Sequence, residues 1–92
     1  MKKAFVYILR CSDGTLYTGW TNDLKKRIEK HNKGLGAKYT RARRPCKMVF
    51  FTEVSDKKRA MQIEYRIKRL KKKYKENIVS NFDRKKLELI TR

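Results

Sequence analysis

The chain has 92 residues, and its 27 Lys and Arg against 9 Asp and Glu give a formal net charge of +18. We expect one domain over residues 1–92, with a core over about 4–72 and a helical tail over 73–92. Hydrophobic residues make up 39 % of the chain, which excludes a disordered basic tail. The positive charge favours a polyanionic partner, and nucleic acid is the first candidate.

The first two predicted strands are joined by a tight turn. Residues 4–9, AFVYIL, are continuously apolar and rich in β-branched and aromatic types, so we expect a strand covered on both faces. The segment CSDGT then leads into a second strand, LYTGW, at 16–20. A three-residue loop over 12–14 would place Gly14 at the left-handed position that such hairpins need.

The length of this loop decides where two tyrosines lie. The three-residue loop pairs Tyr7 with Gly19 and places Tyr7 and Tyr17 on one face of the sheet as diagonal neighbours. A two-residue loop over 13–14 would place the tyrosines on opposite faces. We favour the first register, which also leaves space over Gly19 beside the Tyr7 ring.

A basic helix and a basic loop follow the hairpin. Thr21 or Asn22 is expected to cap the helix, which runs to about Asn32 and ends at Gly34. Its inward stripe comprises Leu24, Ile28 and His31, with Arg27 on the flank. Residues 33–46 then form a long loop. This loop carries five cations beside one tyrosine: Lys33, Lys38, Arg41, Arg43 and Arg44, with Tyr39.

A third strand and a second, longer helix complete the predicted core. The strand is KMVFFTEV at 47–54, and Ser55 or Asp56 caps a helix to about Lys72. The predicted buried stripe comprises Ala60, Ile63, Ile67, Leu70 and Tyr74, with Glu64 at its edge. One or two short helices around 77–89 follow, with Asp83 as a cap. The whole reads as an α/β fold of the α+β type: a small three-stranded, mainly antiparallel sheet with flanking helices and a helical tail.

Several of these residues could carry chemistry, although each also has an ordinary structural explanation. Arg27 and His31 are four residues apart on one helix, so their side chains point the same way. Tyrosines in a sheet usually serve packing, a histidine beside apolar residues is usually a core residue, and Glu64 could simply pair with Lys68. Five cations in one loop favour contact with phosphates.

Together these residues resemble the GIY-YIG nuclease domain. The resemblance rests on Tyr7, Tyr17-Thr18-Gly19, Arg27, His31 and Glu64, covers about residues 4–72, and is closest to the small stand-alone bacterial members. The sequence departs from the family pattern at Phe5, where the family has Gly, and at Thr18, where it has Ile. Asn77 and Asn81 are candidates for an Asn that the family often has near the end of the domain.

The resemblance implies a metal-dependent endonuclease. Glu64 would hold Mg²⁺ or Mn²⁺, with water and substrate phosphate completing the coordination. Arg27 would bind the scissile phosphate, and Tyr7 would take a proton from the attacking water, its pKa lowered by nearby cations. Tyr17 and His31 would orient water and phosphate, and Gly19 would be glycine because Tyr7 and the substrate need the space above it. The loop residues Lys33, Lys38, Tyr39, Arg41, Arg43 and Arg44 would bind the nucleic acid.

For the biological setting we expect a cytoplasmic monomer that acts on DNA rather than RNA, in repair or recombination. Cys11 and Cys46 are isolated and without ligand-spaced partners, which argues against structural zinc and for reduced thiols. No segment reaches the length of a membrane span, and Arg10 follows the N-terminal apolar run without a cleavage site. Recognition could be of nicks, flaps or branches, or could come from a protein partner.

Three other functions compete with the nuclease. A non-catalytic DNA- or RNA-binding module on the same fold would explain the charge equally well and would bind without metal. A ribosome- or RNA-associated protein would leave the nuclease residues unexplained. Binding to a membrane surface is disfavoured, because the helix at 57–73 has cations almost all round.

Overall fold

A computed structural model describes residues 3–83 and 85–87 and shows one three-stranded antiparallel sheet with helices on both faces. The strands are β1 (Ala4–Arg10), β2 (Leu16–Thr21) and β3 (Lys47–Val54), in the order β2-β1-β3. The helices are α1 (Leu24–Asn32), α2 (Lys38–Arg41), α3 (Lys57–Lys68) and α4 (Lys72–Ser80). The predicted fold class is confirmed. None of the helices in this described part could cross a membrane.

The hairpin between β1 and β2 has the three-residue loop. Gly14 has a φ of +83°, the left-handed conformation that this loop requires. Tyr7 pairs with Gly19, and Leu9 pairs with Tyr17. Both tyrosines therefore lie on the same face of the sheet, as predicted.

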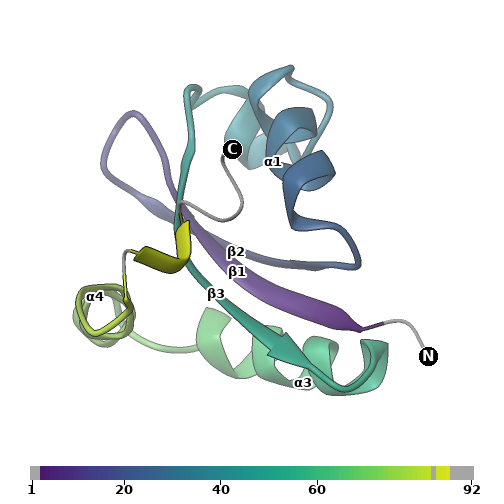
Figure 1. Cartoon of the computed structure of the whole chain (residues 1–92). Helices are drawn as coiled ribbons and strands as arrows, with labels where there is room; N and C mark the ends of the chain where they lie inside the picture. The colour runs from purple at the N-terminus through teal and green to yellow at the C-terminus, as the bar shows by residue number, and fades with distance from the viewer. Residues whose placement is uncertain (1–2, 84, 88–92) are drawn as a thin grey trace.

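β1 is the central strand and buries both of its faces. Helices α1 and α2 lie on one side of the sheet and α3 on the other (Figure 1). Residues on the α1 side form one hydrophobic cluster, which includes Tyr7, Leu9, Leu24 and Met48. Residues on the α3 side form a second cluster, which includes Val6, Ile8, Ala60 and Ile67. This two-sided burial explains why the sequence of β1 is continuously apolar.

The first helix is capped by a different residue from those predicted. The side chain of Asp23 accepts a hydrogen bond from the backbone N–H of Lys26 at 3.1 Å, so Asp23 is the N-cap of α1. Thr21 supports the cap instead, since its hydroxyl accepts the N–H of Asp23 at 3.1 Å. Gly34, with a φ of +79°, follows the C-terminus as predicted.

The second long helix is shorter than predicted. Asp56 caps α3, which ends at Lys68, and α4 begins only at Lys72. Leu70 and Tyr74 are consequently 37 % and 49 % exposed, so their place in a buried stripe was wrong. The break lets α4 turn back and pack Ile78 and Val79 against the α3-side cluster.

The predicted helical tail begins with α4. Asp83 accepts the N–H of Lys85 at 3.0 Å, in keeping with its predicted role as a cap. The end of the predicted tail, residues 88–92, lies outside the described residues.

Candidate active site

The hydroxyl of Tyr7 is the centre of the candidate site. Tyr7 lies on β1 and is 1 % exposed. Its oxygen is 2.8 Å from Nε2 of His31 and accepts a hydrogen bond from Nε of Arg27 at 3.3 Å. Arg27 and His31 reach the same hydroxyl because they lie one turn apart on α1. The i, i+4 spacing seen in the sequence therefore converges on one atom.

Thr40 determines which nitrogen of His31 carries the proton. Thr40 is fully buried on α2, and its hydroxyl donates to the carbonyl of Ala37 at 3.0 Å. With its proton used there, Oγ1 must accept from Nδ1 of His31, which is 2.7 Å away. Nε2 is then unprotonated and accepts the proton of the Tyr7 hydroxyl. The direction of the Tyr7–His31 hydrogen bond follows from this chain of contacts.

Gly19 allows Tyr7 to lie where it does. A Cβ at this position would be 2.5 Å from the Tyr7 oxygen and 2.7 Å from Cζ, too close for any real contact. The space over Gly19 is thus filled by the Tyr7 hydroxyl itself, rather than left open for substrate. Glycine is required at position 19 because the ring of Tyr7, its partner on β1, lies directly against the β2 backbone there.

Tyr17 joins the catalytic candidates to the basic loop. Its ring meets His31 edge-on, with centroids 5.3 Å apart, and stacks on Tyr39 at 6.0 Å. The Tyr17 hydroxyl also interacts with the side chain of Arg27. Tyr17 is half-buried whereas Tyr7 is almost completely buried, so Tyr17 is the more accessible of the two tyrosines.

Glu64 approaches the site from the other side of the sheet. It lies on α3, yet its negative charge is felt by both Tyr7 and Tyr17, because β2 is an edge strand and α3 packs across it. Lys68, one turn further on, is 3.8 Å from the Glu64 carboxylate, and this pair was predicted. The side chain of Glu64 is 21 % exposed, so an ion could reach it.

The electrostatics of the site keep both buried groups neutral. Burial raises the pKa of Tyr7 to about 12, against the opposing effect of Arg27. Burial, and then the positive charge of Arg27, lowers the pKa of His31 to about 4. Arg27 does lower the pKa of Tyr7, as expected of a nearby cation, but desolvation outweighs Arg27 and the net shift is upward.

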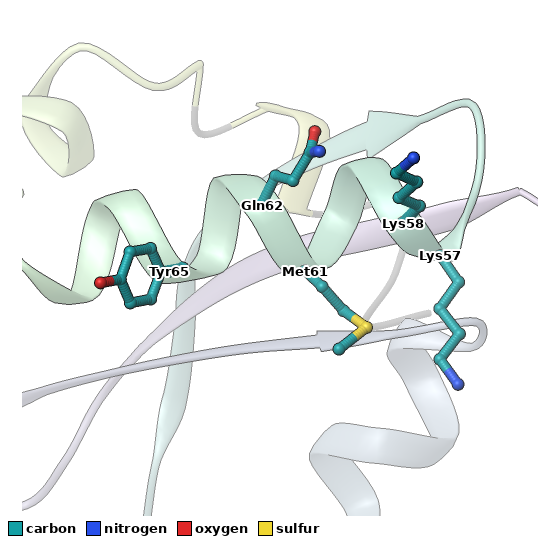
Figure 2. A pocket seen from close by; sticks show the side chains of 5 residues that line it. All are labelled: Lys57, Lys58, Met61, Gln62 and Tyr65. Atoms are coloured by element: carbon teal, nitrogen blue, oxygen red, sulfur yellow. The ribbon is translucent and has the colours of Figure 1, made fainter.

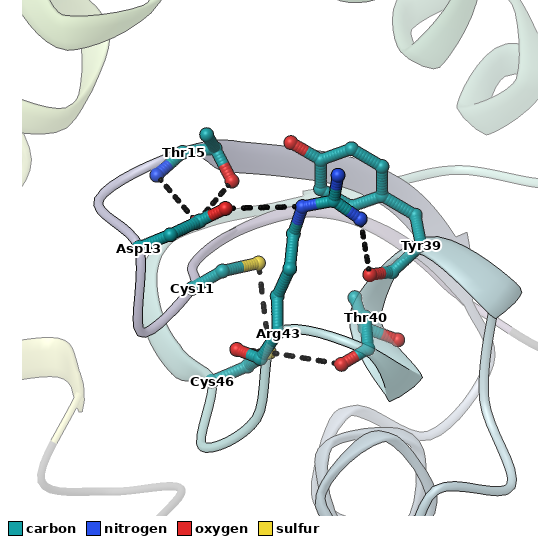
Figure 3. A network of polar contacts seen from close by, with 7 residues as sticks. All are labelled: Cys11, Asp13, Thr15, Tyr39, Thr40, Arg43 and Cys46. Atoms are coloured by element: carbon teal, nitrogen blue, oxygen red, sulfur yellow. Dashed lines mark hydrogen bonds and ion pairs between the residues drawn. The ribbon is translucent and has the colours of Figure 1, made fainter.

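The predicted basic loop contains α2 and is held in place by Arg43. The Arg43 guanidinium donates to Asp13 at 3.1 Å and to the carbonyl of Tyr39 at 3.0 Å, and it lies 3.8 Å from the Tyr39 ring centroid (Figure 3). Arg44 donates to the carbonyl of Arg41 at 3.0 Å. These two arginines are thus partly used within the protein.

The remaining loop cations are available to a ligand. The side chains of Lys33, Lys38 and Arg41 make no hydrogen bond or ion pair with residues 3–83 or 85–87. They are the members of the predicted nucleic-acid-binding set that are best placed to contact phosphates.

Sequence reasoning missed two residues that hold the site together. Thr40 carries no signal in the sequence beyond its place in a basic loop. Asn32 accepts the N–H of Cys46 at 2.8 Å and donates to its carbonyl at 3.0 Å, which ties the end of α1 to the end of the loop. Cys46 in turn lies 3.5 Å from Cys11, with both thiols free and buried. A buried polar partner could be found only from the tertiary structure.

Glu64 is the residue that could hold a metal ion. The part of the chain that the structure describes has no group of three or more His, Cys, Asp or Glu side chains suited to a metal. A single accessible carboxylate fits Mg²⁺ or Mn²⁺, hard cations that commonly keep several waters and take further oxygens from phosphate.

The family model of the GIY-YIG catalytic domain matches residues 3–77 of this chain. The chain belongs to the GIY-YIG family. The candidate residues Tyr7, Tyr17, Arg27, His31 and Glu64 all lie within the matched segment. This is a nuclease family, so the nucleic-acid character inferred from the charge agrees with the family.

Similar bacterial proteins match most of the length of this chain. The UPF0213 protein CPE1444 of Clostridium perfringens is 52 % identical over 84 % of this chain and 83 % of its own length. The UPF0213 protein YazA of Bacillus subtilis is 50 % identical over 78 % and 73 %.

Two solution NMR structures share the fold. The UPF0213 protein BH0048 of Bacillus halodurans has a TM-score of 0.56 and 47 % identity, covering 85 % of this chain and 83 % of that one. The protein EF2693 of E. faecalis has a TM-score of 0.60 and 34 % identity, covering 89 % and 88 %.

Proposed function

We propose that this protein hydrolyses phosphodiester bonds in DNA with the help of a divalent metal ion. The observation that supports this most strongly is the convergence of Arg27, His31 and Tyr17 around the Tyr7 hydroxyl, with the charge of Glu64 acting at the same point. A tyrosine that serves only packing needs one hydrogen-bond partner. This one has two, and both are groups suited to phosphate binding or proton transfer.

Arg27 is suited to bind the scissile phosphate. Its Nε is used by Tyr7, and it also interacts with Tyr17, but a guanidinium has five N–H donors. The remaining donors form a fixed fork for phosphate oxygens as negative charge builds up on them. The hydrogen bond to Tyr7 holds that fork in one orientation.

Glu64 would hold the metal ion, completed by waters and substrate oxygens. A bound ion would stabilise the negative charge on the phosphate and on the departing oxygen. Glu64 also raises the pKa of Tyr7 and Tyr17 through its own negative charge. A cation bound to Glu64 would offset the carboxylate's negative charge and so remove one contribution that raises the pKa of the two tyrosines.

Tyr7 would act as the proton acceptor for the attacking water. Its own proton would first pass to Nε2 of His31, the nitrogen that Thr40 keeps unprotonated, and its phenolate oxygen would then take a proton from the attacking water. Because the pKa of Tyr7 is about 12 in the protein alone, forming this phenolate costs free energy, and positive charge near the hydroxyl would lower that cost. Arg27 would stabilise the resulting phenolate.

The substrate we propose is structured DNA, such as a nick, flap or branch, met in repair or recombination. The net charge of +18 supports contact with a phosphate backbone without reading bases. The described residues form one sheet and its helices. We therefore propose that the substrate is selected by its DNA shape or by a protein partner.

The test is cleavage of supercoiled plasmid and of a panel of branched, nicked and plain duplexes, with RNA counterparts, in Mg²⁺, Mn²⁺ or EDTA. Glu64→Gln and Arg27→Ala should each lower the rate by roughly 100-fold or more. Glu53→Gln is the matched control, because Glu53 lies half-exposed on β3 and pairs only with Lys3 at 3.3 Å among the described residues. Equal rates in Glu64→Gln and Glu53→Gln would refute the assignment.

A non-catalytic nucleic-acid-binding module is the second candidate. The near-complete burial of Tyr7 and its raised pKa favour it, since both keep the proposed base neutral and away from water. A binding module should bind nucleic acid with an affinity that depends strongly on salt and is the same in Mg²⁺ and in EDTA. It should cleave no substrate in the panel.

A further inference from the structure

A hollow of about 210 Å³ lies against Tyr17 at the edge of the sheet. Four elements contribute to its wall: β2, α2, α3 and α4. Its lining residues are Leu16, Tyr17, Thr18, Tyr39, Lys68 and Lys75. Of these, Tyr17 alone belongs to the five catalytic candidates, so the hollow adjoins the candidate active site without being part of it.

Two lysines from different helices meet at this hollow. Lys75 of α4 is half-buried, whereas Lys71, Lys72 and Lys73 beside it are exposed. Lys75 makes no ion pair with any residue that the structure describes. A lysine that lines a hollow without an anionic partner among the described residues can form an ion pair with an anion bound there.

The second lysine is held only loosely. Lys68 lies 3.8 Å from the carboxylate of Glu64 and 5.9 Å from the centroid of the Tyr17 ring, and its side chain is 49 % exposed. An i, i+4 pair with a half-exposed lysine and a distance near the limit of an ion pair contributes little stability. Lys68 can therefore turn to an anion in the hollow, and no acidic residue is among those that line it.

The aromatic walls favour a phosphate over a nucleobase. One face of Tyr39 is covered by the Arg43 guanidinium, 3.8 Å from its centroid, and the ring also stacks on Tyr17. A base that stacked on Tyr39 would compete with these two contacts, whereas a phosphate at the hollow would not. What the hollow does offer is two ammonium groups and the phenol edges.

We propose that this hollow binds a backbone phosphate of the same nucleic-acid strand, one neighbouring the phosphate that Arg27 binds. Tyr17 separates the two positions, with His31 at one edge of its ring and Lys68 facing the ring from the other helix layer. This inference rests on the proposed function, because the neighbouring phosphate is the one that Arg27 would bind. Binding of a phosphate in the hollow, however, requires neither a metal ion nor cleavage. It would fix the register of the strand across the site.

The test measures binding of a short fluorescein-labelled DNA duplex by anisotropy in EDTA, over a series of KCl concentrations. The variants are Lys68→Gln, Lys75→Gln and the double variant. Each lysine that contacts a phosphate should contribute about 1 to the slope of log affinity against log salt, so the double variant should lose about 2. Lys75→Gln by itself leaves the Lys68–Glu64 pair intact, which separates phosphate contact from a disturbance of Glu64.

The matched control is the double variant Lys57→Gln with Lys58→Gln. These lysines, at the start of α3, line a separate, apolar hollow with Met61, Gln62 and Tyr65 of the same helix (Figure 2). They lie about 15 Å along the helix from Lys68, since α-helices rise about 1.5 Å per residue. The control changes the net charge equally and should change the slope far less.

Equal slopes in the control and the hollow variants would overturn the proposal. A second arm follows the amide NMR signals of Thr18 and Lys75 during titration with thymidine 3′,5′-bisphosphate or inorganic phosphate. Stronger shifts with the bisphosphate support a strand-phosphate site. Equal shifts with both, together with unchanged slopes, would make the hollow a site for free phosphate and overturn it.

The two proposals can fail separately. Binding slopes that depend on Lys68 and Lys75, without any cleavage, would keep the phosphate site and refute the nuclease. Cleavage that depends on Glu64, together with salt slopes of the hollow variants equal to those of the control, would support the nuclease and refute the phosphate site.

Discussion

At the residue scale, two hydrogen bonds of the Thr40 hydroxyl determine which nitrogen of His31 carries the proton. The Thr40 hydroxyl donates to the Ala37 carbonyl and accepts from Nδ1 of His31, which leaves Nε2 for Tyr7. Thr40 is thus a positioning residue: it acts through His31 and touches no reacting atom. The same three contacts make the interior of the site both polar and fully paired.

Thr40→Val should destabilise the protein by about 1–3 kcal/mol, because it leaves the Nδ1–H of a fully buried histidine without an acceptor. Urea unfolding measures this loss, and nitrogen NMR of the imidazole should show a mixture of tautomers. Thr40→Ser, which keeps the hydroxyl, is the control and should retain the single tautomer. Identical tautomer signals in the two variants would contradict the role given to Thr40.

His31 should also make stability depend on pH. Its pKa is lowered from 6.5 to about 4 by burial and by Arg27, so the folded protein resists protonation where the unfolded chain does not. Stability is therefore complete above about pH 6.5 and falls as the pH is lowered through 4. The loss at pH 4 should be about 3 kcal/mol from this group.

The measurement is urea unfolding of the wild type and of His31→Gln from pH 7 to pH 4. Glutamine cannot protonate, so the gap in unfolding free energy between the two proteins should shrink by about 3 kcal/mol over this range. Other titrating groups cancel in the comparison. A gap that stays constant with pH would show that His31 is readily protonated in the folded state.

At the scale of elements, the β1–β2 pairing determines the geometry of the site. The pairing of Tyr7 with Gly19 brings the Tyr7 ring against a residue without a side chain. A slip of one residue would turn Tyr17 to the opposite face and away from His31. The turn at Gly14 thus positions two catalytic candidates that lie further along the strands.

Gly19→Ala should destabilise the protein by about 1–3 kcal/mol, since its Cβ would be 2.5 Å from the oxygen of a buried Tyr7. It should also weaken any cleavage, because Tyr7 must move away from His31. Chemical unfolding and the cleavage assay measure the two effects.

The control for this change is Thr18→Val, the adjacent residue on the other face of β2. Its hydroxyl is buried, and the described part of the chain offers it no hydrogen-bond partner. Replacing it with an isosteric methyl should leave stability unchanged or raise it. A Gly19→Ala protein as stable as Thr18→Val would mean that Tyr7 has room to shift.

At the scale of the whole molecule, the excess of positive charge opposes folding. The described acidic residues form few ion pairs, of which Arg10–Glu76, with contacts of 2.6 and 2.9 Å, ties β1 to α4. The remaining cations repel one another on a surface with a net charge of +18. Binding of a polyanion would relieve the same repulsion.

Raising KCl should therefore raise the midpoint of thermal unfolding, by roughly 5 °C for each kcal/mol of repulsion that is screened. A short DNA duplex at low salt should raise it too, and differential scanning fluorimetry measures both. A midpoint that falls with KCl would show that ion pairs such as Arg10–Glu76 outweigh the net repulsion.

The sequence by itself determined the sheet, the hairpin register and the convergence of Arg27 with His31. These follow from local rules: apolar runs form strands, Gly14 selects the turn, and residues four apart share a helix face. The position of Gly19 opposite Tyr7 came from the same register.

Only the tertiary structure decided what surrounds these residues. Burial raised the pKa of Tyr7 where the charge of the sequence favoured a decrease, because desolvation depends on every element that covers the hydroxyl. Thr40 bonds to His31 although the two lie on different helices, and Ile78 and Val79 of α4 pack against the α3-side cluster after α3 ends at Lys68. Periodicity and turn chemistry act over a few residues, whereas burial and buried hydrogen bonds are set by contacts across the whole fold.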